Sequence, residues 1–164
     1  MPETGLLQGY RLVVFDADDT LRQTTVPGKP CPHRPDEWVL RPGVREALHN
    51  VPWGGAGGPR LGMASNQDQV AYGFLSLEMA HRLLRDLAVA ATGSAPSDEA
   101  LQLCPHPMDA RCECRKPQPR MLQNIMEYYG VSPADTLFVG NDEVDREAAA
   151  RAGVKFVWAA DLFD

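Results

Sequence analysis

Residues Arg11–Thr20 read RLVVFDADDT and join an apolar run to an acidic loop. The first half, Arg11–Phe15, is short, apolar and rich in β-branched residues, which predicts a buried strand. The second half, Asp16–Thr20, places three carboxylates and a hydroxyl directly after that strand. In open α/β sheets, ligands bind beyond the carboxyl ends of the strands, so this loop is a candidate site.

Further strands and helices alternate along the rest of the chain. The expected strands are Leu61–Ser65, Glu99–Cys104, Thr136–Asn141 and Lys155–Ala159. The expected helices are Leu40–Val51, Leu75–Ala91, Pro119–Gly130 and Val144–Val154. In Leu75–Ala91 we expect one apolar face made by Leu77, Ala80, Leu84 and Leu87. This alternation predicts an α/β fold with a parallel sheet and helices on both faces.

Length and composition limit the classes of protein. A chain of 164 residues fits a single domain, and a net charge of -6 argues against a nonspecific nucleic-acid binder. Its apolar runs are far shorter than the roughly 20 residues that span a bilayer, and the first ten residues, MPETGLLQGY, lack a leader pattern. We therefore expect a cytoplasmic monomer with reduced thiols, no membrane partner and no nucleic-acid partner.

Polar side chains follow the other predicted strands as well. They are Ser65, Asn66 and Gln67 after the second strand, Arg115 and Lys116 beyond the third, and Asn141, Asp142 and Asp145 after the fourth. Because parallel strands end at one edge of a sheet, we expect these groups to converge on the Asp16–Thr20 loop. Mg²⁺ prefers oxygen ligands and a lysine supplies a point charge for phosphate, so the pattern predicts a site for both.

The segment Leu103–Gln118, LCPHPMDARCECRKPQ, gathers three of the four cysteines of the chain and one of its four histidines. Clustered cysteines in a reducing compartment indicate metal ligands or catalysts before disulfides. The alternative is that these thiols are buried and free of metal, but the CxH and CxC spacing favours zinc. Cys31 and His33 have no second pair nearby, so they are expected to be unliganded loop residues, with Trp38 lining the pocket.

Four segments together resemble the motifs of the haloacid dehalogenase superfamily in order and spacing: VVFDADDTL, MASNQ, CRKP and FVGNDEVD. The resemblance covers nearly the whole chain. It implies one domain over residues 1–164, a Rossmann-like three-layer parallel sheet and phosphoric monoester hydrolase activity. The cysteine-rich loop resembles the zinc loop of the branch that holds histidinol-phosphate phosphatases and D-glycero-D-manno-heptose 1,7-bisphosphate phosphatases.

The resemblance also implies roles for individual residues. Asp16 is the expected nucleophile, Asp18 the general acid and base, and Lys116 the cation that holds Asp16 and phosphate together. The expected substrate contacts are Ser65, Asn66, Arg115 and Thr20. The expected Mg²⁺ ligands are Asp16, Asp18 and either Asn141 or Asp142. The expected ligands of a structural Zn²⁺ are Cys104, His106, Cys112 and Cys114.

The chain departs from the family pattern in the loop Gly140–Asp145. Asn141 stands where the family has its first acid, and an amide oxygen brings no charge, so weaker metal binding is expected. Asp142 is the alternative ligand, and Asp145 matches the second acid. Asp19 replaces the more usual glycine of the first motif.

The sequence is compatible with several classes of substrate. The segments between motifs are too short for a large cap domain, so we expect a shallow pocket bordered by the Arg22–Trp38 loop and the zinc loop. A phosphorylated small metabolite, histidinol phosphate or a heptose bisphosphate, fits best. The five-residue gap between His106 and Cys112 and the triplet Asn66–Asp68 resemble the histidinol-phosphatase version. The alternatives are a 3′-phosphatase acting on nucleic-acid ends and a catalytically weakened binding protein, the latter suggested by Asn141.

Overall fold

A five-stranded parallel sheet forms the centre of the structure, a computed structural model that describes residues 4–164. The strands lie in the order β5-β4-β1-β6-β7. Their bounds are β1 Leu12–Phe15, β4 Arg60–Asn66, β5 Leu101–Cys104, β6 Thr136–Gly140 and β7 Lys155–Trp158. All four residues of β1 are fully buried, and Phe15 pairs in register with Met63 of β4 and Val139 of β6. The predicted parallel sheet is confirmed, and its central strand is the one that leads into Asp16.

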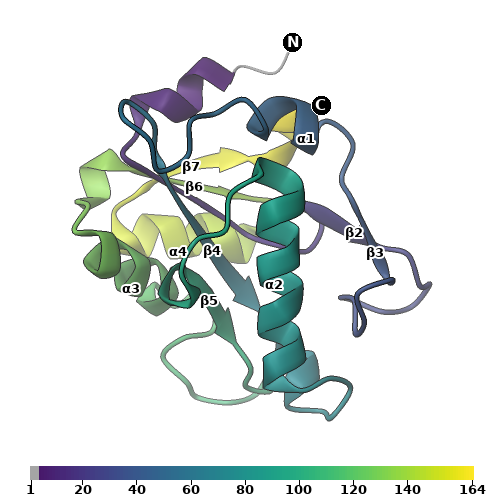
Figure 1. Ribbon diagram of the computed structural model, residues 1–164. Coiled ribbons are helices and arrows are strands. Elements are labelled where there is room, and N and C mark those ends of the chain that lie inside the picture. The colour runs from purple at the N-terminus through teal and green to yellow at the C-terminus, as the bar shows by residue number, and fades with distance from the viewer. Residues whose placement is uncertain (1–3) are drawn as a thin grey trace.

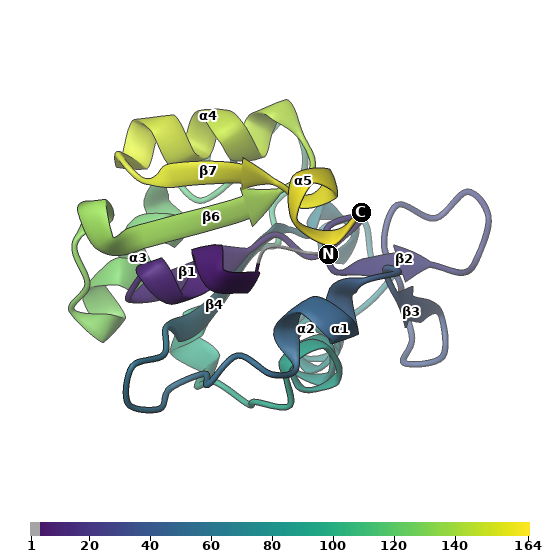
Figure 2. The same ribbon diagram turned by 90° about the horizontal axis from the view of Figure 1, so that it is seen from above.

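Helices cover both faces of the sheet, as Figures 1 and 2 show. On one face lie α1 (Val44–Leu48), α2 (Leu77–Thr92) and α5 (Ala159–Phe163), and on the other α3 (Arg120–Tyr129) and α4 (Glu143–Ala152). Side chains of a strand alternate between the two faces. Val13 and Phe15 therefore pack in the core under α2, whereas Leu12 and Val14 pack in the core under α3 and α4. Short 3₁₀ turns lie at Thr4–Gly9, Asp68–Val70, Asp98–Ala100 and Pro133–Asp135.

Two helix predictions need correction. The helix expected over Leu40–Val51 is only the five-residue α1, because Leu40 still belongs to a strand and Gly43 precedes the helix at φ 87°, a left-handed backbone. In α2, Leu77 is 47% exposed at the first position and does not belong to the buried face. The buried residues of α2 are Ala80, Leu83, Leu84, Leu87, Ala88, Ala91 and Thr92.

A small antiparallel pair was not predicted. β2 (Arg22–Thr24) and β3 (Trp38–Leu40) pair with each other outside the main sheet. They project beyond the carboxyl ends of β6 and β7 (Figure 2). Trp38 packs partly buried against the core and is not among the residues that line the main cavity, which corrects the expectation for this residue. The segment between the two strands forms a loop at the rim of that cavity.

No helix within residues 4–164 is both long enough and apolar enough to cross a membrane.

Candidate active site

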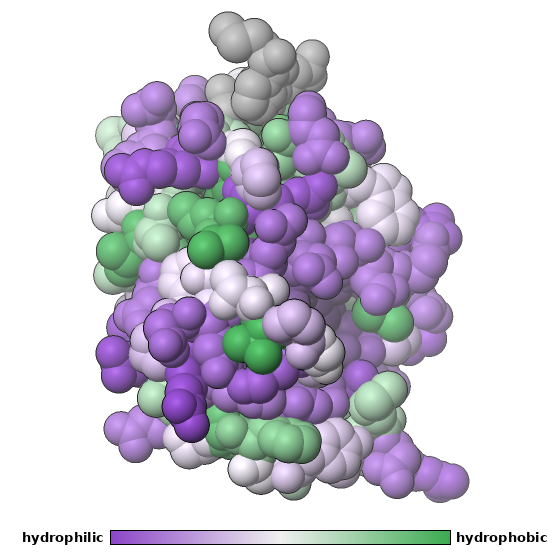
Figure 3. Space-filling view, turned by 90° about the vertical axis from the view of Figure 1, so that its right-hand side faces the viewer, coloured by the Kyte–Doolittle hydropathy of each residue, from purple (hydrophilic) through white to green (hydrophobic). Residues whose placement is uncertain are grey.

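A cavity of about 410 Å³ opens at the carboxyl ends of the strands. The side of the molecule that carries β2 and β3 is largely hydrophilic and is hollowed near its middle (Figure 3). The lining residues come from all the segments that the sequence singled out: Asp16, Asp18, Asp19, Pro30, Cys31, Asn66–Gln69, Arg115–Pro117, Asn141, Asp142, Val144 and Asp145. The polar strand ends therefore converge on one cavity, as predicted.

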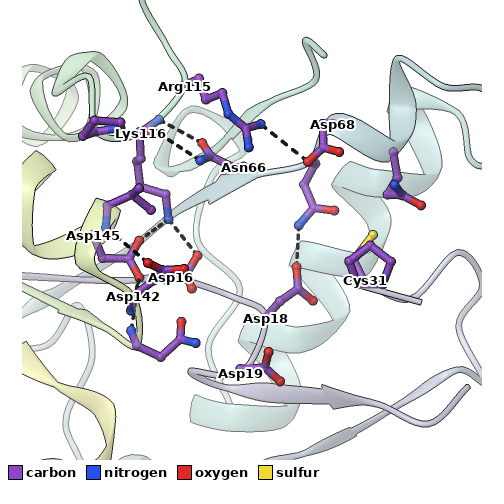
Figure 4. A pocket seen from close by; sticks show the side chains of 16 residues that line it. Asp16, Asp18, Asp19, Cys31, Asn66, Asp68, Arg115, Lys116, Asp142 and Asp145 are labelled. Atoms are coloured by element: carbon purple, nitrogen blue, oxygen red, sulfur yellow. Dashed lines mark hydrogen bonds and ion pairs between the residues drawn. The ribbon is translucent and has the colours of Figure 1, made fainter. Parts of the chain in front are cut away.

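Lys116 is the centre of this site. Its Nζ lies 2.7 Å from Asp16 Oδ1 and 2.6 Å from Asp145 Oδ1, and it donates to the Ala64 carbonyl at 2.8 Å. Figure 4 shows the amine pointing between the two carboxylates. Burial by itself would lower the pKa of Lys116, but the charges of Asp16 and Asp145 outweigh it and raise the pKa. Lys116 is therefore a fixed, protonated cation.

Asp16 has two carboxylate oxygens in different surroundings. Oδ1 is held by Lys116, whereas Oδ2 accepts from Thr20 Oγ1 at 3.3 Å. Burial raises the pKa of Asp16 to about 7, with the charge of Lys116 opposing the rise and that of Asp145 adding to it. Its backbone N–H donates to the Val139 carbonyl at 2.9 Å, which fixes the residue at the end of β1. Asp16 is also one of the residues that line the cavity, so its carboxylate faces whatever binds there.

Asp18 is held by two residues that the sequence did not single out for this role. Arg22 Nε donates to Asp18 Oδ1 at 2.8 Å, and Gln67 Nε2 donates to Asp18 Oδ2 at 2.8 Å. Arg22 is only 1% exposed, although arginines are mostly surface residues. Arg22 lies four residues after its partner Asp18. This spacing outside a helix gives no recognisable sequence pattern, so only the structure revealed the pair.

The expected substrate contacts separate into two groups. Ser65 is buried and accepts from Gln67 Nε2 at 2.7 Å, and Thr20 is fully buried against Asp16. Neither is among the residues that line the cavity, and their contact with a substrate stays a prediction. Asn66 and Arg115 do line the cavity.

Asn66 also fixes the backbone of Lys116. Its Nδ2 donates to the Lys116 carbonyl at 3.2 Å, and the Lys116 N–H donates to its Oδ1 at 2.9 Å. Arg115, by contrast, is tied only loosely, since its guanidinium lies 3.5 Å from Asp68 Oδ1. Arg115 is therefore the cavity cation that is most free to meet an anionic substrate group.

The loop after β6 distinguishes Asn141 from Asp142. Asp142 is the N-cap of α4, and its carboxylate accepts from the Val144 N–H at 3.4 Å. Asp145 accepts from the N–H groups of Asn141 and Asp142 at 3.1 and 3.2 Å, which holds the loop closed. The side chain of Asn141 reaches Thr20 Oγ1 at 3.1 Å, beside Asp16. Asn141 therefore has its side chain beside Asp16, whereas that of Asp142 is engaged at the start of α4.

A second group of ligand atoms lies in the loop before Lys116. The Sγ atoms of Cys104, Cys112 and Cys114 and a ring nitrogen of His106 all lie within 4.8 Å of one another. His106 Nδ1 is 3.3 Å from Cys104 Sγ and 3.1 Å from Cys114 Sγ. The structure thus brings together the four predicted ligands, a set that could hold a metal ion.

Cys31 lies apart from that group, at the rim of the main cavity. Burial raises the pKa of its thiol to about 12, and the nearby charge of Asp18 adds to the rise. A raised thiol pKa disfavours a reactive thiolate at Cys31 at neutral pH.

Two loops meet at the rim of the cavity. The ring of His33, from the loop between β2 and β3, stacks on Phe74 with centroids 5.2 Å apart. Its Nε2 lies 3.1 Å from Gln69 Oε1. The predicted border of the pocket by the Arg22–Trp38 loop is therefore present, and His33 connects it to the segment after β4.

Comparisons with known proteins agree with this geometry. A profile of the haloacid dehalogenase-like hydrolases matches residues 33–153. A D-glycero-beta-D-manno-heptose-1,7-bisphosphate 7-phosphatase of Pseudomonas aeruginosa is 37% identical over 117 residues, which cover 70% of this chain and 62% of that protein. The enzyme of the same name from Bordetella bronchiseptica is 30% identical over 146 residues, covering 87% of this chain and 76% of that one.

A solved structure shares the fold. The crystal structure of D,D-heptose 1,7-bisphosphate phosphatase from B. bronchiseptica, complexed with magnesium and phosphate, has a TM-score of 0.72 and 29% sequence identity. The match covers 89% of this chain and 78% of that one. The chain spans about 62% of the length of the P. aeruginosa relative.

The buried ion pairs of Lys116 give a test of stability. Lys116→Met leaves the carboxylates of Asp16 and Asp145 buried without a cation, so the free energy of unfolding should fall by about 3–5 kcal/mol in urea denaturation at pH 7. Arg120→Met is the control, because Arg120 and Glu113 form an exposed pair whose loss should cost about 0–1 kcal/mol. Equal losses for the two variants would contradict the role of Lys116.

The raised pKa of Asp16 gives a pH dependence in metal-free protein. The pKa of an unfolded aspartate is about 3.9, whereas burial raises the pKa of folded Asp16 to about 7. Between these values the folded state binds the extra proton, so the Asp16 contribution to stability falls as pH rises and is lost above the folded pKa. With a chelator present, the stability of wild type relative to Asp16→Asn should decrease from pH 5 to pH 7.5 and then level off. A constant difference would show that Asp16 is not perturbed.

Proposed function

Because the chain belongs to the haloacid dehalogenase-like hydrolase family, we propose that it is a Mg²⁺-dependent phosphatase that releases phosphate from a phosphorylated small metabolite. The observation that carries the proposal is the buried Lys116, which holds Oδ1 of Asp16 at 2.7 Å in a cavity that both residues line. A carboxylate fixed beside a cation at the end of a central strand suits covalent phosphoryl transfer.

The reaction follows from the positions of three side chains. Asp16 attacks phosphorus and forms an aspartyl-phosphate, while Lys116 offsets the repulsion between the two anions. Asp18, in its protonated form, gives its proton to the leaving oxygen of the substrate as the ester bond breaks. It then takes a proton from the water that attacks the aspartyl-phosphate, which releases phosphate and restores Asp16. Arg22 Nε and Gln67 Nε2 each donate to one oxygen of Asp18, which holds the carboxyl group in place and leaves a further lone pair on Oδ1 for the proton.

The residues present fit a Mg²⁺ ion beside Asp16. Asp16 Oδ2, the Asp18 carbonyl and the Asn141 side chain lie together, with the Asn141 amide 2.9 Å from the first and 3.2 Å from the second. Carboxylate, carbonyl and amide oxygens are ligands that Mg²⁺ accepts. When bound, the ion would neutralise charge on the transferring phosphoryl group.

We also propose that Cys104, His106, Cys112 and Cys114 hold a structural Zn²⁺. A Cys₃His set leaves no open position for catalysis. The loop from residue 105 to residue 119 has neither helix nor strand, and it delivers Arg115 and Lys116 to the cavity. A metal at the start of this loop would brace it.

The relatives favour a heptose bisphosphate as the substrate, since both curated relatives described above carry that name. The short gap between His106 and Cys112 is the argument for histidinol phosphate, and it stays a prediction. A nucleic-acid end is disfavoured by the net charge of -6 and by Asp19, Asp68 and Asp142 in the cavity lining.

The activity is tested by phosphate release with Mg²⁺ from a heptose 1,7-bisphosphate, histidinol phosphate, hexose phosphates, nucleotides and a 3′-phosphorylated oligonucleotide. We expect one sugar phosphate or histidinol phosphate to reach a kcat/KM of about 10⁴ M⁻¹s⁻¹ or more. Asp16→Asn should abolish turnover because it removes the nucleophile, whereas Asp98→Asn, on the exposed surface, should not. Turnover retained by Asp16→Asn would exclude the mechanism, and faster release from the oligonucleotide would reverse the order of substrates.

The zinc site is tested by elemental analysis of protein purified without chelator. We expect about one zinc per chain, because four thiolate and imidazole ligands complete a tetrahedral shell. Cys112→Ser should lose most of that zinc, whereas Cys31→Ser, a cysteine outside the cluster, should retain it. Zinc far below one per chain in the wild type would exclude the site.

A further inference from the structure

The side chain of Asn141 meets three oxygen atoms around Asp16. With the amide in one orientation, Oδ1 accepts from Thr20 Oγ1 at 3.1 Å but faces Asp16 Oδ2 and the Asp18 carbonyl, neither of which can donate. With the amide turned by 180°, its nitrogen lies 2.9 Å from Asp16 Oδ2, 3.2 Å from the Asp18 carbonyl and 3.1 Å from Thr20 Oγ1, and its two hydrogens point among these three acceptors. Without a metal, only the turned orientation satisfies these atoms.

Thr20 completes the turned arrangement. Its hydroxyl can accept from the Asn141 nitrogen while donating its own hydrogen to Asp16 Oδ2 at 3.3 Å. Thr20 is fully buried, so it has no water to satisfy it and depends on these partners. Thr20 therefore connects Asn141 to Asp16 on the buried side of the site.

An acid at this position would behave differently. A carboxylate has no hydrogen to donate, and it would add a negative charge beside Asp16. Lys116 already serves two carboxylates, those of Asp16 and Asp145. Asp142 does not take over as a ligand, since it caps α4. The Asn141 amide thus stabilises the metal-free site, whereas the Mg²⁺ site has one charged ligand fewer than it would have with an acid at this position.

We propose that the Asn141 amide is a two-position device at the magnesium site: its nitrogen closes the site without metal, and its oxygen turns inward to bind Mg²⁺. This inference rests on the proposed function in placing Mg²⁺ beside Asp16. Mg²⁺ binding then has to replace the hydrogen bonds of the Asn141 amide. Asn141 adds no negative charge that would attract the ion.

The test compares wild type, Asn141→Asp and Asn141→Ala by Mg²⁺ calorimetry and by thermal unfolding in Mg²⁺-free buffer without chelator. Asn141→Asp should bind Mg²⁺ about tenfold tighter or more, because ligand charge sets affinity. In Mg²⁺-free buffer it should unfold at a lower temperature than wild type, and millimolar Mg²⁺ should reverse the order. Asn141→Ala should also unfold earlier in Mg²⁺-free buffer but should gain no affinity, since it lacks both the donor and the ligand.

A direct readout is the side-chain NH₂ signal of Asn141 in ¹⁵N-labelled protein, assigned by its loss in Asn141→Asp. In Mg²⁺-free buffer the signal reports the amide beside Asp16, and Mg²⁺ should shift it because the amide turns. Equal stability of wild type and Asn141→Asp in Mg²⁺-free buffer, or an unchanged signal with bound Mg²⁺, would overturn the amide role alone. If calorimetry shows no Mg²⁺ binding by either protein at millimolar concentration, the metal dependence of the proposed function falls with it.

Discussion

The ammonium group of Lys116 is the interaction on which the site depends. One buried cation joins Asp16 at the end of β1, Asp145 in the first turn of α4 and the Ala64 carbonyl of β4. Each partner needs the others, because two buried carboxylates without the lysine, or a buried lysine without them, would be desolvated without compensation. The same contact that links three elements also gives Asp16 its electrostatic surroundings, so structure and chemistry share one network.

Lys116 itself comes from a loop without regular structure, and its place is fixed from two directions. Asn66 binds both backbone polar groups of Lys116 from the end of β4. The Cys/His cluster gathers the earlier part of the loop around Cys104, the last residue of β5. The neighbouring strands β4 and β5 therefore supply the two supports of a segment that could not otherwise hold a buried charge in register.

Sequence patterns were sufficient for the sheet, because β1, β4 and β6 are buried apolar runs that end directly in polar groups. They were also sufficient to group Asp16, Lys116 and the four Cys/His residues. They failed for β2, β3 and α5, which span three to five residues and are too short to show a period. Arg22 and Gln67 were missed as partners of Asp18 because side chains pairing across a turn leave no spacing rule, and the full burial of Arg22 runs against the usual preference of arginine.

The central place of β1 has a consequence for motion. Strands on both sides hydrogen-bond to it, and all its side chains are buried, so its amide hydrogens belong to the unit that opens only on global unfolding. Asp16 follows this strand directly and is expected to share its slow exchange. The rim is built differently, because a single histidine, His33, connects two loops there through Gln69 and Phe74. Hydrogen exchange would thus separate a slow centre, which holds Asp16, from a faster margin around the cavity.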